Sequence, residues 1–374
     1  MYNTLINEFG EINMQDIWHF PRKELTDKLT NAIRYNIIHS FTLFAPRRIG
    51  KTYFLNYDLK PALDELGYKT IYFSFADQIG NHLQQFKNSL AQNIDRTIFS
   101  KFKIKEISFP WCKIAISQNT TFTDLSILEL LSVLAHEAEK RSSQIVLMLD
   151  EIQELIYVDN AEGFVGELRT ALDLNKNYIK VIFTGSSRYG LRKMFSDNKA
   201  PFFHFGTSLK MEPFGRGFTD FLAETYHSIT GKYLDGEEFY QIFCKLNFVT
   251  LSIREFLSFY MMCQDIPLDD AYRYFEADMF DKNGYVSYWN SLIQAEKILL
   301  LGLVNNYQNF YSDKFYDFIL QNYQIEITQG RVQNALNKLL GHGDIHENDN
   351  GEYEIEDLFM KRWLESRKDE AGII

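Results

Sequence analysis

The sequence has 374 residues, enough for two or three domains, and its 45% of hydrophobic residues supports a packed core. A formal net charge of −11 argues against a protein whose main task is to hold nucleic acid, because such proteins usually present a basic face. The three cysteines, Cys112, Cys244 and Cys263, form no CxxC pair, which argues against a disulfide framework and a structural zinc site.

Two further features bear on where the protein works. The N-terminus has no basic stretch followed by an apolar one, so the sequence predicts no signal peptide. The longest apolar run, near residues 298–304, is too short to cross a lipid bilayer. We therefore expect a soluble, cytoplasmic protein that does not act on a membrane.

The first predicted element is an amphipathic helix over residues 17–38, which leads into an apolar strand at residues 41–44. The segment that follows the strand has the composition of a phosphate-binding loop: Ala45, Pro46, Arg47, Arg48, Ile49, Gly50, Lys51 and Thr52. A helix is predicted from Tyr53 onward. This strand–loop–helix context favours a nucleotide site over the alternative, a basic surface turn before a helix.

Each residue type in this loop has a use. Backbone N–H groups of such a loop surround a phosphate, and the N-terminus of the following helix adds the positive end of its dipole. Gly50 permits the tight turn, Lys51 can reach the β- and γ-phosphates, and the hydroxyl of Thr52 can bind Mg²⁺. ATP or ADP with Mg²⁺ is therefore the predicted cofactor. Arg22, with Glu24 and Leu25, lies where an N-terminal arm could cover the adenine.

Five strands separated by helical patterns are predicted before residue 213. The strands are at residues 41–44, 70–75, 145–149, 179–184 and 205–211, and the helices between them are at 82–100, 125–139 and 163–173. This alternation predicts an α/β fold with a mostly parallel, doubly wound sheet. Residues 102–122 are less regular and are predicted to be a surface excursion.

Two carboxylates follow the apolar strand at 145–149. Ligands of parallel sheets bind at the carboxyl ends of the strands, so Asp150 and Glu151 are predicted to lie beside the phosphate loop. Asp150 is the candidate for holding Mg²⁺, and Glu151 is the candidate for orienting the attacking water. The alternative is a strand that ends in a solvated acidic turn.

The next strand, at 179–184, ends in and is followed by residues with hydroxyl side chains. Thr184 and Ser186 are candidates for sensing the γ-phosphate, although such residues are also common in turns.

The strand pattern stops at Pro213. Helical patterns at 217–226, 237–246, 250–260 and 269–280 predict an all-helical lid over residues 213–285, after an ATPase core with its N-terminal arm over residues 1–212. Arg254 lies near the start of one lid helix, where it could point at the γ-phosphate. The alternative is an arginine that faces solvent on an amphipathic helix.

Residues 286–374 have a different pattern. Helices are predicted at 288–304, 311–323 and 329–340, followed by short strands at 345–347 and 353–355 and a last helix at 358–367. Three helices and a two-stranded wing predict a winged helix. This segment has 8 basic and 14 acidic residues, a formal charge of −6, which opposes contact with phosphates. We therefore favour a winged helix that contacts a protein or stabilises the lid over one that binds DNA.

Four motifs, taken together, resemble a known family. They are residues 46–52, the Leu149-Asp150-Glu151 tip, the Thr184-Gly185-Ser186-Ser187 segment and the Met211-Glu212-Pro213-Phe214 segment. In this order they are similar to the archaeal-type ATPases of the MNS/STAND group, which are AAA+-like relatives of origin-recognition-type initiators. The resemblance implies a P-loop fold with one extra strand between the loop strand and the acidic strand, a helical lid and a C-terminal winged helix. It also implies ATP binding, slow hydrolysis and a switch-like action on a partner.

The sequence departs from the family at two places. Ala45 replaces the first glycine of the loop, which a small residue can do. A Gly-Arg pair is missing before the last core strand, so Arg188 or Arg192 of a neighbouring subunit is the candidate arginine finger.

The expected function is that of an AAA+/STAND-type ATPase that acts as a nucleotide-dependent switch on a protein partner or an assembly. Two alternatives stay open: an ATP-gated DNA-binding protein of the initiator or mobile-element type, and a scaffold that retains ADP.

Overall fold

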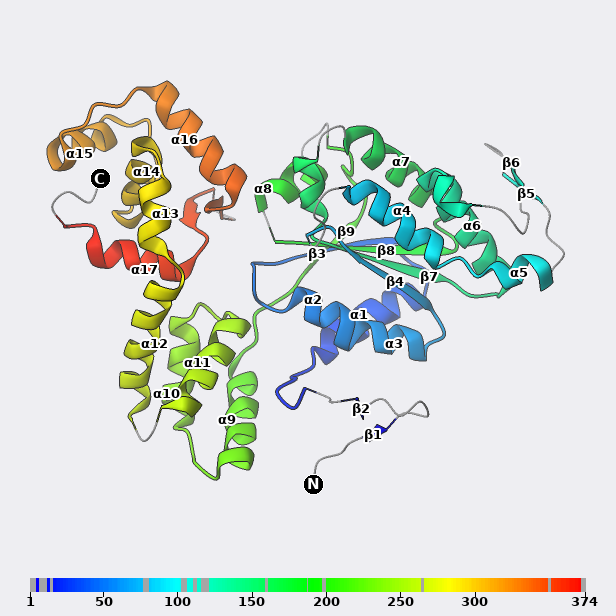
Figure 1. Ribbon diagram of the computed structural model, residues 1–374, viewed down its shortest axis with the longest axis horizontal. Helices are drawn as coiled ribbons and strands as arrows, with labels where there is room; N and C mark the ends of the chain where they lie inside the picture. Colours follow the sequence, from blue (N-terminus) through cyan, green and yellow to red (C-terminus); the bar gives the residue numbers. More distant parts are fainter. Residues whose placement is uncertain are drawn as a thin grey trace.

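The computed structural model describes most of the chain (Figure 1). The described residues are 5–6, 12–13, 16–76, 81–101, 106–109, 113–115, 121–158, 161–186, 188–196, 200–263, 266–348 and 351–370. Among the helices of these residues, none is both long and apolar enough to span a lipid bilayer.

A five-stranded parallel sheet forms the centre of the predicted ATPase core. Its strands, in spatial order, are β4 (Lys69–Ser74), β7 (Ile145–Asp150), β8 (Ile179–Gly185), β3 (Ser40–Phe44) and β9 (Thr207–Lys210). Every neighbouring pair is parallel. The predicted α/β fold is confirmed, and β8 is the extra strand between the phosphate-loop strand β3 and the acidic strand β7.

Helices cover both faces of this sheet (Figure 1). On one face lie α4 (His82–Gln92), α6 (Ile127–Lys140) and α7 (Ala161–Leu174). On the other lie α1 (Lys23–Arg34) and the continuous run of α2 (Lys51–Tyr53), η1 (Phe54–Leu59) and α3 (Lys60–Glu65). Residues of β7 alternate between the two cores: Leu147 packs with the first layer, and Val146 and Met148 with the second. Asp150 therefore belongs to the face that carries the phosphate loop.

Three predicted helices are shorter or broken. Residues 17–22 are not helical; the backbone N–H of Arg22 instead donates to Asp58 Oδ2 at 3.0 Å. The helix predicted at 82–100 ends at Gln92 and resumes as α5 (Arg96–Lys101), because the buried carboxylate of Glu137 accepts the N–H of Asp95. The helix predicted at 288–304 is two helices, α13 (Tyr285–Ser291) and α14 (Gln294–Val304).

Small elements complete the core. The predicted excursion contains a hairpin of β5 (Glu106–Ser108) and β6 (Lys113–Ala115), and the η2 turn (Phe122–Asp124) begins at its last residue. Trp111 and Cys112 lie outside the described residues. Two short paired strands, β1 (Leu5–Ile6) and β2 (Ile12–Asn13), precede the core. Three short helices follow the strands β7 and β8: η3 (Ile152–Tyr157) after β7, and α8 (Arg188–Leu191) with η4 (Arg192–Ser196) after β8.

After β9, the regular elements of the described residues are helices and one hairpin. Four helices occupy the predicted lid segment: α9 (Arg216–Thr230), α10 (Gly236–Lys245), α11 (Thr250–Met262) and α12 (Leu268–Lys282). Then come α13, α14, α15 (Asp313–Tyr323), α16 (Gln329–His342), the hairpin of β10 (Ile345–Glu347) and β11 (Tyr353–Ile355), and α17 (Leu358–Arg367). We call residues 286–374 the C-terminal module.

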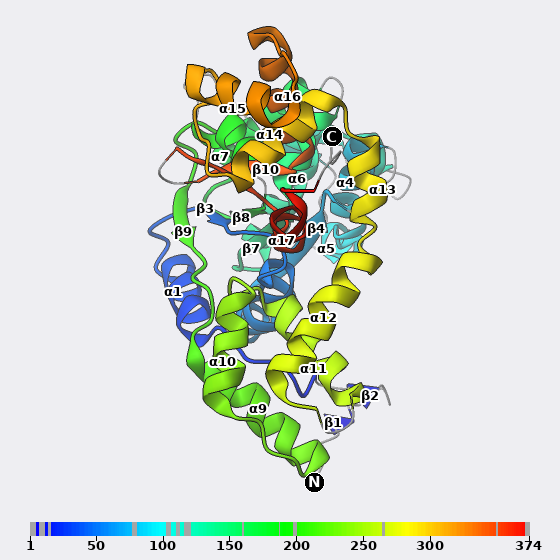
Figure 2. The same cartoon turned by 90° about the vertical axis from the view of Figure 1, so that its left-hand side faces the viewer.

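The lid helices and the C-terminal module share one apolar core, which extends from Phe218 to Leu364. Phe275 of α12 packs edge-on against Phe359 of α17, with 5.9 Å between ring centroids. Figure 1 shows these helices beside the sheet, and Figure 2 shows them as one elongated body in front of it. The module also contacts the ATPase core, since β10 and α16 lie against α8.

Candidate active site

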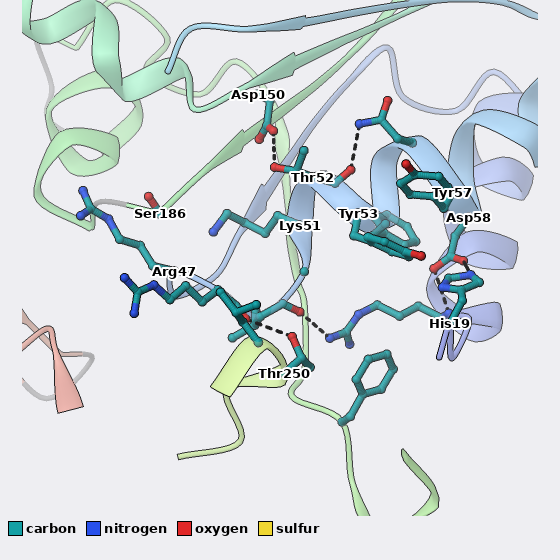
Figure 3. A pocket seen from close by; sticks show the side chains of 18 of the residues that line it. His19, Arg47, Lys51, Thr52, Tyr53, Tyr57, Asp58, Asp150, Ser186 and Thr250 are labelled. Carbon is teal, nitrogen blue, oxygen red and sulfur yellow. Dashed lines mark hydrogen bonds and ion pairs between the residues drawn. The ribbon is translucent and has the colours of Figure 1, made fainter. Parts of the chain in front are cut away.

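The phosphate loop has the tight backbone that its sequence predicts. Gly50 has φ of 93°, a conformation that favours glycine, and Arg48 also lies in the left-handed region with φ of 62°. The ammonium of Lys51 folds back over the loop and donates to the carbonyls of Ala45 and Pro46, both at 2.9 Å. The loop thus holds its lysine in a fixed position beside the helix N-terminus (Figure 3).

Lys51 faces the acidic strand tip across the loop. Its side chain is only 4% exposed, and its Nζ lies 3.8 Å from Glu151 Oε1. Burial lowers the pKa of Lys51, while the nearby charges of Glu151 and Asp150 act in the opposite direction. The two motifs that the sequence places about a hundred residues apart therefore meet.

Three hydroxyl groups converge on the carboxylate of Asp150. Thr52 Oγ1 donates to Oδ2 at 2.5 Å, the hydroxyl of Tyr72 donates to the same oxygen at 3.0 Å, and Thr184 Oγ1 donates to Oδ1. Asp150 is 1% exposed, and Thr184 is completely buried behind it. This placement gives Thr184 a part in orienting Asp150, since its hydroxyl does not line the cavity where a γ-phosphate would be sensed.

Glu151 is held through one of its two oxygens. Its backbone is left-handed, with φ of 51°, which turns the side chain away from the strand direction. Oε2 accepts hydrogen bonds from the backbone N–H of Ser186 at 3.2 Å and from its hydroxyl at 2.7 Å. The other oxygen, Oε1, is on the side of Lys51. Of the two predicted sensor residues, Ser186 is the one that reaches both Glu151 and the cavity.

A cavity of about 730 Å³ opens in front of these groups. Three parts of the predicted ATPase core line it: the end of the phosphate loop with α2 and η1, the tips of β4 and β7 with Glu154, and the residue after β8. The segment before α1 and the start of the lid with α11 complete the lining. The predicted site residues that line it are Arg47, Arg48, Ile49, Gly50, Lys51, Thr52, Tyr53, Asp150, Glu151, Ser186 and Arg254. Ala45 and Pro46 contribute their carbonyls to Lys51, and Glu24 and Leu25 are not among the lining residues.

Aromatic and acidic residues form the end of the cavity away from Lys51. The rings of Tyr53 and Tyr57 stack with 4.3 Å between centroids, and the ring of His19 lies 5.1 Å from Tyr53. His19 Nε2 is 2.7 Å from Asp58 Oδ1. The sequence did not predict His19, Tyr57 or Asp58 at the site. No local sequence pattern indicates that residues 16–22 fold over η1.

The predicted arm and the predicted lid arginine meet at this end. Arg254 Nη2 pairs with Asp16 Oδ2 at 2.9 Å, and the hydroxyl of Tyr53 donates to the same oxygen at 2.8 Å. The guanidinium of Arg22 donates to the carbonyl of Ile49 at 3.0 Å and lies 3.7 Å above the ring of Phe214. Arg22 thus links the loop to the start of the lid, while the contact of Arg254 with a γ-phosphate stays a prediction.

The lid also touches the phosphate loop directly. Thr250, the first residue of α11, donates its hydroxyl to the carbonyl of Arg48 at 3.0 Å, and the N–H of Leu251 donates to the same carbonyl at 3.2 Å. The N-terminus of a lid helix therefore holds Arg48, one of the two left-handed residues of the loop. The side chains of Arg188 and Arg192, the predicted arginine fingers, lie outside those that the structure describes.

A parallel sheet with a glycine–lysine–threonine loop on one strand and an aspartate–glutamate tip two strands away, joined by one cavity, defines a P-loop ATPase. Residues 20–244 match the model of a family described as the ATPase domain predominantly from Archaea. The chain belongs to this family, and it is an ATP-hydrolysing enzyme.

Similar solved structures share the fold over nearly the whole chain. The Walker-type ATPase PABY2304 of Pyrococcus abyssi is 18% identical, with a TM-score of 0.66 over 92% of this chain and 96% of that chain. The Aeropyrum pernix ORC2 protein, in complexes with ADPNP and ADP, is 12% identical, with a TM-score of 0.57 over 96% of this chain and 97% of that chain. No curated protein matches the sequence.

Proposed function

We propose that this ATPase binds ATP with Mg²⁺ in the cavity and acts as a nucleotide-dependent switch on a protein partner or an assembly. The observation that carries the catalytic part is the meeting of Lys51, Thr52, Asp150 and Glu151 at one end of the cavity. The ADPNP and ADP complexes of the A. pernix protein support the choice of nucleotide. The predicted cytoplasmic location stays a prediction.

The residues present suit a magnesium ion. Thr52 Oγ1 and Asp150 Oδ2 are 2.5 Å apart at the cavity wall, and both are hard oxygen donors of the kind that Mg²⁺ prefers. Among the described residues no group of three His, Cys, Asp or Glu could hold a metal, so phosphate and water oxygens would complete its shell. When bound, the ion would neutralise charge on the β- and γ-phosphates.

The protein's own groups then have distinct tasks. Loop N–H groups and Lys51 bind and orient the phosphates, Thr52 and Asp150 hold the ion, and Oε1 of Glu151 accepts a hydrogen bond from the attacking water. Ser186 fixes the second oxygen of Glu151 and is close enough to the cavity to respond to a γ-phosphate. Catalysis in this account is placement plus charge neutralisation.

Contacts of the C-terminal module support the switch. A Cβ on Gly343 would lie 3.4 Å from Arg47 Nη2, so the loop arginine extends to the turn between α16 and β10. Glu356 is close enough for its charge to act on Lys51. A γ-phosphate would compete with the module for Arg47 and repel Glu356, so docking of the module should depend on the nucleotide.

We also propose the divisions 1–212, 213–285 and 286–374, with the last segment a winged helix. The helix before the wing, α16, presents few Lys and Arg side chains: Lys338 pairs with the buried Glu296 at 2.6 Å, which leaves Arg331. This favours a protein partner over DNA. Gel-shift assays with and without ATP at stated salt test the DNA alternative, and binding that requires ATP would support it.

The catalytic assignment is tested by Glu151→Gln, which keeps the shape of the side chain and removes its charge. We expect this variant to bind ATP as the parent does and to hydrolyse it at least about 100-fold more slowly. Binding is measured by titration and turnover by phosphate release. Unchanged turnover would remove Glu151 from its role.

A further inference from the structure

Gln153 lies in η3, two residues after Glu151, and has no part in the mechanism above. Its side chain is completely buried. Two glycines make room for it: a Cβ on Gly185 would collide with Gln153 Oε1, and a Cβ on Gly190 would lie 2.7 Å from Gln153 Cβ. Gly185 ends β8 and Gly190 belongs to α8, so two separate elements form a slot for one amide side chain.

The amide in this slot bridges two carboxylates. Gln153 Nε2 donates to Glu151 Oε2 and, at 3.4 Å, to Glu154 Oε1. The two carboxylates repel each other: burial raises the pKa of Glu154, and the charge of Glu151 raises it further. An amide is well suited to this place, because its NH₂ group carries two donors and no charge.

Packing alone does not account for a glutamine here. Gln153 Oε1 is buried and has no hydrogen-bond partner among the described residues, which is unfavourable for a polar atom. A methionine or leucine would fill the slot without that cost. What the glutamine adds is the donor group directed at Glu151.

This donor affects which oxygen of Glu151 is available. Oε2 accepts hydrogen bonds from Ser186 N, Ser186 Oγ and Gln153 Nε2, whereas Oε1 lies toward Lys51 on the cavity side. A carboxylate with one oxygen anchored by three donors has a fixed orientation. Its second oxygen is then preorganised to accept a hydrogen bond from water.

We propose that Gln153 is a positioning residue for ATP hydrolysis: its amide anchors Oε2 of Glu151 so that Oε1 faces the reacting water. The inference rests on the role of Glu151 proposed above. Gln153 touches neither nucleotide nor water in this account and acts only through Glu151.

The experiment uses Gln153→Met in the full chain, since methionine is unbranched, close in size and unable to donate a hydrogen bond. We expect turnover to fall by about tenfold, the effect of one lost hydrogen bond to a charged group. The dissociation constant of a non-hydrolysable ATP analogue should stay within about twofold of the parent value. Leu155→Met, a volume-conserving change at a buried residue of the same short helix, is the matched control and should change neither quantity.

A second variant separates positioning from a general structural role. In the Glu151→Gln background, Gln153→Met should cause no further loss, because a residue that acts through Glu151 has nothing left to position. An additive loss, or a parallel loss of analogue binding, would contradict the inference. If Gln153→Met keeps its turnover while Glu151→Gln is inactive, only the positioning role of Gln153 is rejected. If Glu151→Gln itself stays active, the proposed role of Glu151 is rejected.

Discussion

At the scale of single residues, Asp150 is the most constrained group of the site. Its hydroxyl donors come from three elements: Thr52 from α2, Tyr72 from β4 and Thr184 from β8. Hydrogen bonds from three separate elements fix the orientation of this buried carboxylate. In the function proposed above, the aspartate is thereby oriented to hold a cation before any nucleotide enters.

The hydroxyl of Tyr72 can be removed without changing the ring. We expect Tyr72→Phe to raise the Mg²⁺ concentration for half-maximal ATPase activity by about tenfold, because an outer donor that orients a metal ligand is lost. Activity against Mg²⁺ at saturating ATP measures this. Tyr178→Phe, which removes a hydroxyl bonded to Glu139 away from the cavity, should leave the curve in place. An unchanged curve for Tyr72→Phe would show that Thr52 and Thr184 suffice.

Residues of the site differ in how far the sequence predicts them. Short local motifs contain Lys51, Thr52, Asp150 and Glu151, and these motifs predict the chemistry of the four residues without knowledge of the fold. Tyr72 could be found only through the strand register, which pairs Ser74 with Asp150 and so brings this part of β4 beside the strand tip. Gln153 and His19 depend on tertiary packing, for which no local pattern exists.

At the scale of elements, hydrophobic periodicity predicted the five strands to within two residues at each end. Two helices predicted as continuous, at 82–100 and 288–304, are broken in the structure, and each break has a polar cause. Glu137 takes the N–H of Asp95 and interrupts one helix, and the carboxylate of Glu296 takes the N–H of Ile293 and interrupts another. Periodicity does not reveal a distant or buried carboxylate that captures a backbone donor.

The first turn of α11 supports the phosphate loop, and Thr250 tests this. We expect Thr250→Val to weaken ADP binding by about fivefold, since one hydrogen bond that preorganises Arg48 is worth about 1 kcal/mol. Titration calorimetry measures the change. Thr225→Val makes the same substitution on α9, where the hydroxyl bonds only to the carbonyl of Phe221, and should bind ADP normally. Equal weakening by both variants would point to a general loosening of the lid.

At the scale of the whole molecule, the sequence predicts a lid and a C-terminal module, and the structure shows that they share one apolar core. Arg362 of α17 adds polar contacts to Tyr272 and Glu276 of α12. A shared core of this kind favours movement as a unit, whereas the apolar clusters of the ATPase core are separate and the charges of Glu356 and Lys51 act across the boundary. The sequence could not predict this shared core. Breaks in the helical pattern reveal where one segment ends and the next begins, but they do not reveal how the segments pack.

We expect a non-hydrolysable ATP analogue to move the lid and the module together. Spin labels at exposed Asn177, Tyr233 and Lys314 report on the core, the lid and the module, with the native cysteines replaced by serine. Relative to ADP, the analogue should lengthen the distance between positions 177 and 314 and leave the distance between 233 and 314 unchanged. A change confined to the 233–314 distance would show that the lid moves separately from the module.

The central claim is that a triphosphate lies between the glycine–lysine loop and the aspartate–glutamate tip. Titration of an ATP analogue with Mg²⁺ into Lys51→Ala tests it most directly, with Lys60→Ala, which removes an exposed lysine paired only with Asp64, as the matched control. We predict that Lys51→Ala has no measurable affinity while Lys60→Ala binds as the parent does. Full affinity of Lys51→Ala would contradict the account.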